Sequence, residues 1–276
     1  MLRRIFVPLE NSTNIDSVIK YACFIAKNHD AVVTAGVFFD IHGSQKSFGK
    51  FKEDKITWDK DTSEGTIVDV ENIIFHLINK FKNECKRNKV NFSILQNVGI
   101  PIGKIGDIIK YFDIVVTGVK SEFRISKRRF DSSYLFKMLS YGVTPILSVP
   151  NSFREIKNVI IIYDGSISAS RALQRFAHIA NIDKFNIKIF MSTHNEESGV
   201  KNLNEAKNYL KAYGAEKVSI EWTSKDIFSS VNSFFDYPPD LIVMGLHSKK
   251  FLKSYFIGSV TEHIINRGDV PMFIGI

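Results

Sequence analysis

Short apolar runs alternate with helical patterns along the whole chain. Strands are predicted where apolar residues stand together in short runs, and helices where apolar positions recur three and four residues apart. The clearest helix is predicted over residues 69–89, and its apolar stripe consists of Val70, Ile73, Ile74, Leu77, Ile78, Phe81 and Cys85. Strands that alternate with helices in this way indicate βαβ units and a parallel sheet.

Each half of the chain contains the same series of predicted strands. In the first half they cover residues 5–9, 32–39, 92–98, 114–117 and 145–149, and a further helix is predicted over residues 15–28. In the second half they cover residues 159–163, 187–192, 218–223, 241–244 and 272–274. The segment 150–154 carries turn residues and is predicted to be a short linker.

The two halves also repeat in their polar positions. Gly118 and Gly245 stand at the same offset as Ser132 and Ser259, which is 127 positions. The openings of the halves match at an offset of 154, with residues 5–12 over residues 159–166. We therefore predict two domains, at residues 1–150 and 155–276, with an insertion near residues 42–66 of the first.

A strand, loop and helix unit near the end of the chain is the most informative segment. Asp240-Leu-Ile-Val-Met-Gly245 reads as a buried strand, and Gly258-Ser-Val-Thr-Glu262 as the start of a helix. In a parallel sheet such a loop lies at the carboxyl ends of the strands, where the first N–H groups of the helix face anions. The arrangement suits a phosphate group.

These residues resemble the universal stress protein family. Its nucleotide-binding members carry an Asp at the end of the first strand and a later Gly-x2-Gly-x9-Gly-(Ser/Thr) pattern, and the matching positions here are Asp164, Gly245, Ser248, Gly258 and Ser259. The resemblance covers nearly the whole chain as two copies. It implies an α/β fold of two tandem doubly wound domains, each a five-stranded parallel sheet flanked by helices, like the adenine nucleotide alpha hydrolases.

The resemblance assigns nucleotide-binding roles to residues of the second half. Asp164 would accept a hydrogen bond from adenine or ribose, although the same residue could instead cap the helix that follows. Gly245 and Gly258 would leave room for ribose and phosphates, and the N–H groups of Ser259 and Val260 would meet phosphate oxygens. Thr261 would cap the helix or contact phosphate.

The loop between Gly245 and Gly258 adds basic side chains to this predicted site. His247 occupies a position where the family often places a basic residue, while Lys249, Lys250 and Lys253 could neutralise phosphates or be solvated. Ser248 replaces a family glycine. It could weaken the loop through backbone strain, or donate its hydroxyl to a phosphate.

The first half has lost most of this pattern. Asp131 stands where a glycine is expected and would repel phosphate by about 4 kcal/mol at 4 Å and an effective dielectric of 20. Glu10 and Asn11 replace Asp and Gly, and Ser121 replaces another glycine. We expect a degenerate structural copy here. A basic cluster over residues 124–129 with flanking phenylalanines leaves RNA or DNA binding as an unfavoured alternative.

The composition of the chain limits the kinds of function and cellular location that we expect. A net charge of +8 and a pI of 9.3 allow attraction to polyanions without identifying one. No stretch resembles a signal segment or a membrane span, so a cytoplasmic protein without membrane contact is expected. Cys23 and Cys85 fall on apolar helix faces and are expected to be reduced core thiols. Scattered histidines argue against a metal site.

We expect a stress-response regulatory protein that binds ATP or AMP, with or without magnesium, in its second domain. No nucleophile elbow or zinc-protease motif occurs, so we predict no catalytic residues and at most weak ATP hydrolysis. The alternatives are a nucleotide-free interaction scaffold and a slow ATP hydrolase. The partner protein, the signal and a homodimeric state are left open.

Overall fold

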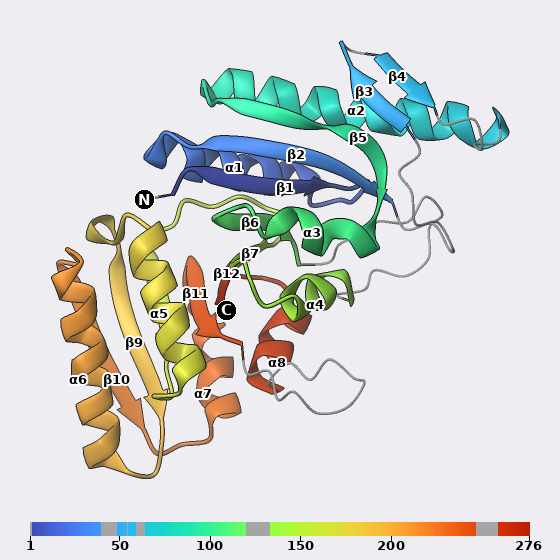
Figure 1. Ribbon diagram of the computed structural model, residues 1–276. Helices are drawn as coiled ribbons and strands as arrows, with labels where there is room; N and C mark the ends of the chain where they lie inside the picture. Colours follow the sequence, from blue (N-terminus) through green and yellow to red (C-terminus); the bar gives the residue numbers. More distant parts are fainter. Residues whose placement is uncertain (1, 40–48, 54, 59–63, 120–132, 247–258) are drawn as a thin grey trace. The chain divides into compact units, whose positions relative to one another are not determined.

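The computed structural model describes residues 2–39, 49–53, 55–58, 64–119, 133–246 and 259–276 (Figure 1). Its contacts divide the chain into two compact units. The N-terminal unit comprises residues 2–144 and 151–153, and the C-terminal unit comprises residues 145–150 and 154–276. Predicted site residues His247, Ser248 and Gly258, and the first-half residues Ser121, Asp131 and Ser132, lie outside the described residues.

Four parallel strands form the sheet of the N-terminal unit, in the order β6-β1-β2-β5. They are β1 (Arg4–Leu9), β2 (Val32–Phe39), β5 (Phe92–Pro101) and β6 (Ile114–Gly118). A hairpin of β3 (Gly49–Lys52) and β4 (Lys55–Trp58) joins the sheet antiparallel to β5. This hairpin falls within the segment where the sequence predicts an insertion.

Helices of the N-terminal unit bury their apolar stripes against this sheet. They are α1 (Ile15–His29), α2 (Glu64–Asn88), α3 (Ile105–Ile109) and α4 (Ser133–Ser140), with a short 3-10 turn η1 (Ile102–Lys104) before α3. Helix α1 packs on β1, β2 and β6 and also on α2. The predicted stripe on α2 is confirmed at six of its seven positions, since Val70, Ile74, Leu77, Ile78, Phe81 and Cys85 are buried, whereas Ile73 is half-buried.

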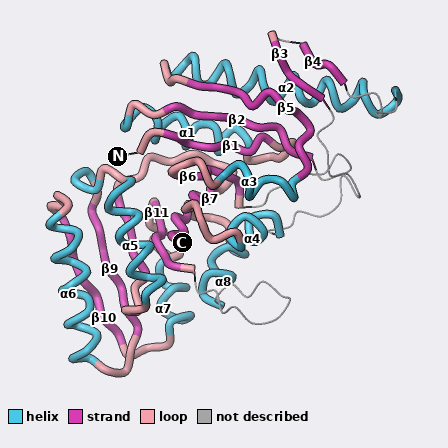
Figure 2. The backbone as a smooth tube through the Cα atoms, viewed as in Figure 1, coloured by secondary structure: helices cyan, strands magenta, loops and turns pink. Residues whose placement is uncertain are grey.

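Six strands form the sheet of the C-terminal unit, in the order β10-β9-β8-β11-β12-β7. Figure 2 draws the strands in magenta. They are β7 (Ile146–Val149), β8 (Asn158–Ile162), β9 (Asn186–Ser192), β10 (Lys217–Thr223), β11 (Leu241–Gly245) and β12 (Met272–Gly275). All pair in parallel except β7, which is antiparallel to β12. The strand order reverses between β8 and β11, and ligands of open α/β sheets bind at such a point.

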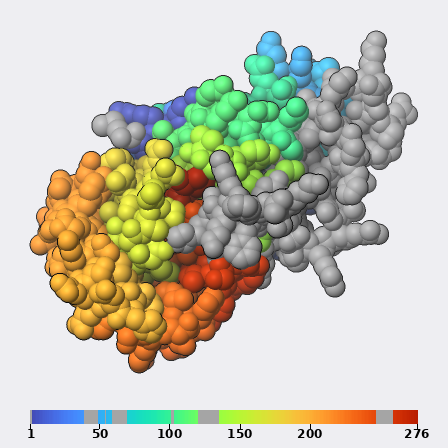
Figure 3. Space-filling view, turned by 60° about the horizontal axis from the view of Figure 1, so that its bottom comes forward, coloured from blue at the N-terminus to red at the C-terminus, as the bar shows by residue number. Residues whose placement is uncertain are grey.

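Helices flank this sheet as well. They are α5 (Ile167–Ile179), α6 (Glu196–Ala212), α7 (Ile227–Phe234) and α8 (Ser259–Arg267), with a 3-10 turn η2 (Ile182–Lys184) after α5. Helix α5 packs on β11 and β12, and α6 packs on β9 and β10. Phe234 of α7 lies edge-on against Phe190 of β9, with ring centroids 4.9 Å apart. In the space-filling view the visible described atoms of residues 154–276 run from yellow through orange to red (Figure 3).

The predicted fold class is confirmed, because mostly parallel sheets are flanked by helices. The structure departs from five purely parallel strands at two places, the β3–β4 hairpin and β7. Strand β7 is buried at all four positions, and its backbone groups pair with β12 within the C-terminal unit. Sequence position alone assigned β7 to the first half, but its pairing places it with the second.

An aspartate ties adjacent strands together at the amino end of each sheet. In the N-terminal unit, an Oδ of Asp113 accepts from the backbone N–H groups of Arg3 at 2.7 Å and Arg4 at 2.8 Å. In the C-terminal unit, Asp240 accepts in the same way from Lys157 at 3.1 Å and Asn158 at 2.8 Å. Asp113 and Asp240 stand at the same 127-residue offset as the motif glycines, so the repeat extends to this interaction.

We expect Asp240→Ala to lower the free energy of unfolding by about 1–2 kcal/mol, because two backbone donors lose a charged acceptor. Chemical denaturation measures the change. Asp236→Ala is the matched control, since Asp236 is exposed in the same unit and surface substitutions usually change stability by less than about 0.5 kcal/mol. Equal effects of the two substitutions would show that the aspartate tie adds no stability.

Candidate functional site: a cavity at the strand ends

A cavity of about 290 Å³ opens in the C-terminal unit where the strand order reverses. The ends of β8, β9 and β11 and the beginnings of α7 and α8 form its walls. The residues that line it are Ile162, Tyr163, Asp164, Ala169, Ser192, Ile227, Met244, Gly245, Ser259, Val260 and Thr261. Of the predicted site residues, Asp164, Gly245, Ser259, Val260 and Thr261 are therefore brought together.

Asp164 shapes the turn between β8 and α5. Its Oδ1 accepts a hydrogen bond from the backbone N–H of Ser166 at 3.0 Å. Gly165 between them has φ +76°, which a residue with a Cβ rarely adopts. The cap of α5 is not Asp164 but Ser166, whose Oγ accepts from the N–H of Ala169 at 3.2 Å. The carboxylate of Asp164 is exposed at the cavity wall, where a ligand can reach it.

Gly245 allows helix α5 to approach the end of β11. A Cβ at this position would lie 2.5 Å from the carbonyl carbon and oxygen of Ser168 and 2.6 Å from the backbone nitrogen of Ala169. These are backbone atoms of a packed helix, so they cannot move aside independently. The motif predicts that Gly245 leaves space for a ligand, whereas the structure shows that close packing of α5 already requires a glycine there.

The beginning of α8 closes the other side of the cavity. Ser259 is exposed, Val260 is half-buried, and Thr261 is 2% exposed. The first N–H groups of a helix have no acceptor within the helix and carry partial positive charge. Glu262 lies in the same first turn and partly offsets this field. The helix beginning can therefore accept an anion, with Thr261 held inside the wall.

Residues that the sequence reasoning did not select complete the cavity. Ser192 ends β9, the strand adjacent to β8, and its Oγ donates to the carbonyl of Lys225 at 2.7 Å. Ile227 begins α7, and Ile162, Tyr163, Ala169 and Met244 add further wall. Ser192 could have been found from the sequence as the polar end of a predicted strand. Ile227 carried no such signal, because α7 was not predicted.

The corresponding place in the N-terminal unit is arranged differently. Glu10, which aligns with Asp164, is only 1% exposed, and Asn14, which aligns with Ser168, is buried as well. The side chain of Asn14 lies against Gly118, in the space that a Cβ at that glycine would occupy. Ser12 donates its hydroxyl to Oδ1 of Asn14 at 2.5 Å. Side chains of the protein thus fill the neighbourhood of this strand end.

The described residues were examined for side-chain groups that could hold a metal ion and for helices that could span a membrane. Among the residues that the structure describes, no group of three or more His, Cys, Asp or Glu side chains could hold a metal ion. None of the described helices is both long and apolar enough to cross a membrane.

Part of the C-terminal unit is similar to a known protein family. Residues 191–274 match the model of the universal stress protein family. A universal stress protein from Synechocystis is 22% identical over 182 residues, which cover 65% of this chain and 63% of that protein. The chain thus spans less than two thirds of that relative's length. Over these residues the chain is similar to universal stress proteins, in agreement with the resemblance seen in its sequence.

Solved structures extend the likeness of the fold to the whole chain. A universal stress protein from Archaeoglobus fulgidus has a TM-score of 0.71 and 14% identity, covering 99% of this chain and 97% of its own. A functionally unknown protein from Pseudomonas aeruginosa has a TM-score of 0.61 and 13% identity, covering 99% of this chain and 92% of its own. At these identities the similarity shows the fold alone.

We expect Gly245→Ala to destabilise the protein by about 1–3 kcal/mol, because the added Cβ forces α5 away from β11. Gly103→Ala is the matched control, since a Cβ at Gly103 would meet no atom within 4 Å. Thermal and chemical unfolding of both variants measure the difference. A Gly245→Ala protein as stable as the control would show that the helix adjusts freely and that packing does not require this glycine.

Proposed function

We propose that the C-terminal unit binds an adenine nucleotide, ATP or AMP, in the strand-end cavity, and that the chain acts as a cytoplasmic stress-response regulator. The observation that carries the proposal is the position of Asp164 and the beginning of α8 on the walls of one cavity. Asp164 offers acceptor oxygens that suit ribose hydroxyls, and the helix offers N–H donors that suit phosphate.

The lining of the cavity supports a nucleoside. Ile162, Ile227 and Met244 provide apolar surface for a flat base, and ligand pockets are mostly apolar with a few polar groups that fix orientation. Ser192 and Thr261 add hydroxyls within the same wall. The volume of about 290 Å³ lies at the small end of such pockets. It suits the nucleoside, with the phosphates extending over the exposed Ser259.

Charge favours the same class of ligand. The chain has a formal net charge of +8, which raises the local concentration of polyanions. His247, Ser248 and Gly258 complete the family pattern in the sequence, and their contribution to phosphate binding stays a prediction. A magnesium ion would travel with ATP as part of the ligand, because no described cluster of side chains is suited to hold one.

ATP or AMP at about 100 times its dissociation constant should stabilise the protein by about 2.7 kcal/mol. We expect Asp164→Ala to lose most of this stabilisation, because the ribose loses its acceptor. Asp240→Ala is the matched control: its carboxylate also accepts backbone N–H groups, but at the opposite end of the sheet. Differential scanning fluorimetry with and without nucleotide measures both. A shift retained in Asp164→Ala and in Gly258→Val would place the nucleotide elsewhere.

We expect calorimetric titration of the intact chain to give about one nucleotide per chain, because Glu10 and Asn14 occupy the strand end of the N-terminal unit. The titration is repeated with and without magnesium, since a bound cation can turn the repulsion between a carboxylate and a phosphate into attraction. Two nucleotides with magnesium and one without it would refute the view that the first half is a degenerate copy.

A further inference from the structure

Two cysteines far apart in the sequence meet in the core of the N-terminal unit. Cys23 lies on α1 and Cys85 on α2, separated by 62 positions, and their Sγ atoms are 3.7 Å apart. Both are free thiols, with exposures of 1% and 0%. We propose that this pair is a site of reversible disulfide formation, in which a peroxide links α1 to α2.

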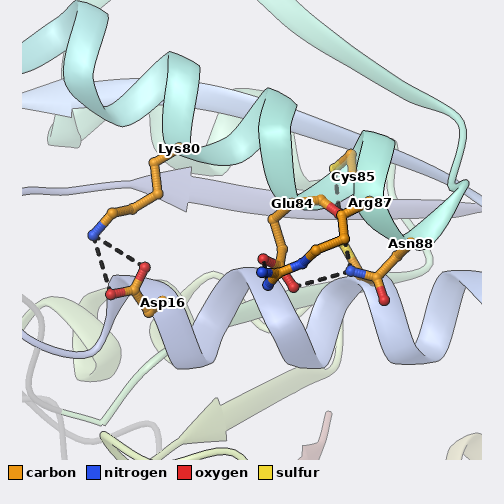
Figure 4. A network of polar contacts seen from close by, with 7 residues as sticks. Asp16, Lys80, Glu84, Cys85, Arg87 and Asn88 are labelled. Atoms are coloured by element: carbon orange, nitrogen blue, oxygen red, sulfur yellow. Dashed lines mark hydrogen bonds and ion pairs between the residues drawn. The ribbon is translucent and has the colours of Figure 1, made fainter.

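An ion pair joins α1 to α2, and further polar contacts lie within α2 beside Cys85. The Nζ atom of Lys80 on α2 lies 3.0 Å from Oδ1 of Asp16 on α1 (Figure 4). Lys80 stands five positions before Cys85 on the same helix. Glu84 accepts from Arg87 and from Asn88 on the side of α2 next to Cys85. Partial burial of Glu84 favours its neutral form, but these hydrogen bonds outweigh it and lower the pKa of the carboxyl. The charged network therefore persists at neutral pH.

The distance between the sulfurs permits a bond after small side-chain movements. A disulfide is about 2 Å long, so the sulfurs must approach by about 1.7 Å. Rotation of the two cysteine side chains is the movement that the bond requires. The direct contact between the sulfurs distinguishes this pair from two separate buried thiols.

The electrostatics assign an order to the chemistry. The hydrogen bond with Cys23, together with burial, raises the pKa of the Cys85 thiol. A raised pKa disfavours the thiolate of Cys85, so we assign the first attack to Cys23. Once Cys23 is oxidised, its sulfur is electrophilic, and the sulfur of Cys85 lies beside it in position to attack.

The reaction balances with a peroxide as the oxidant. The Cys23 thiolate attacks one peroxide oxygen, an S–O bond forms, the O–O bond breaks, and a water molecule leaves after protonation. The sulfur of Cys85 then attacks the sulfenic acid, the S–S bond forms, the S–O bond breaks, and a second water molecule leaves. The two thiols give up two electrons, which reduce the peroxide. A reducing cytoplasm restores both thiols.

The test treats the folded full-length chain with hydrogen peroxide and then alkylates the remaining thiols. We expect a mass loss of about two daltons, because two hydrogens leave, no alkylation, and a non-reduced peptide that joins the segments around Cys23 and Cys85. Oxidised protein should also unfold several degrees higher, because the bond closes a long loop in the unfolded chain, and dithiothreitol should reverse both changes.

Cys23→Ser and Cys85→Ser serve as paired controls, each of which should gain oxygen or form linked dimers instead of the internal bond. If either variant fails to fold, the measurements on the unaltered chain decide the question alone. The proposal is overturned if that chain gains oxygen on separate cysteines, forms only intermolecular links, or keeps both thiols.

Discussion

The close approach of helix α5 to the glycine that ends β11 is the constraint on which the C-terminal unit and its cavity depend. In the C-terminal unit, the backbone of α5 at Ser168 and Ala169 occupies the space beside Gly245. This contact sets how closely the helix packs on the sheet and thereby fixes one wall of the strand-end cavity. The turn before it, ordered by Asp164, Gly165 and Ser166, brings a carboxylate to the same wall.

The same constraint leads to a different result in the N-terminal unit. Asn14 stands where Ser168 stands in the repeat, and its longer side chain lies against Gly118. Glu10, one methylene longer than the aspartate it replaces, is buried at the strand end. The side chain of Asn14 thus occupies the space beside its glycine, and Glu10 is buried where the aligned Asp164 is exposed, while the order of the surrounding strands is the same.

Much of the fold could be predicted because its strands and helices follow from local patterns of apolar and polar residues. The ten predicted strands correspond to observed strands, since buried parallel strands read as short apolar runs. The stripe on α2 predicted its buried face. The hairpin of β3 and β4 was not predicted, because its four-residue strands carry few apolar residues. Five of the eleven residues that line the cavity were predicted from the sequence motifs. Ile227 and Met244 were not, because in the sequence they resemble ordinary core positions.

The sequence by itself determined the alternation of strands and helices, the repeat between the halves, and the chemical types of residue at the strand ends. Only the tertiary structure decided that β7 pairs with β12, that Ser192 and Ile227 join Asp164 around one cavity, and that Cys23 contacts Cys85. The physical reason is that sequence patterns act over a few neighbouring residues, whereas these contacts join residues far apart in the chain. Periodicity reports which face of an element is buried, but contacts between distant residues depend on how the buried faces pack together.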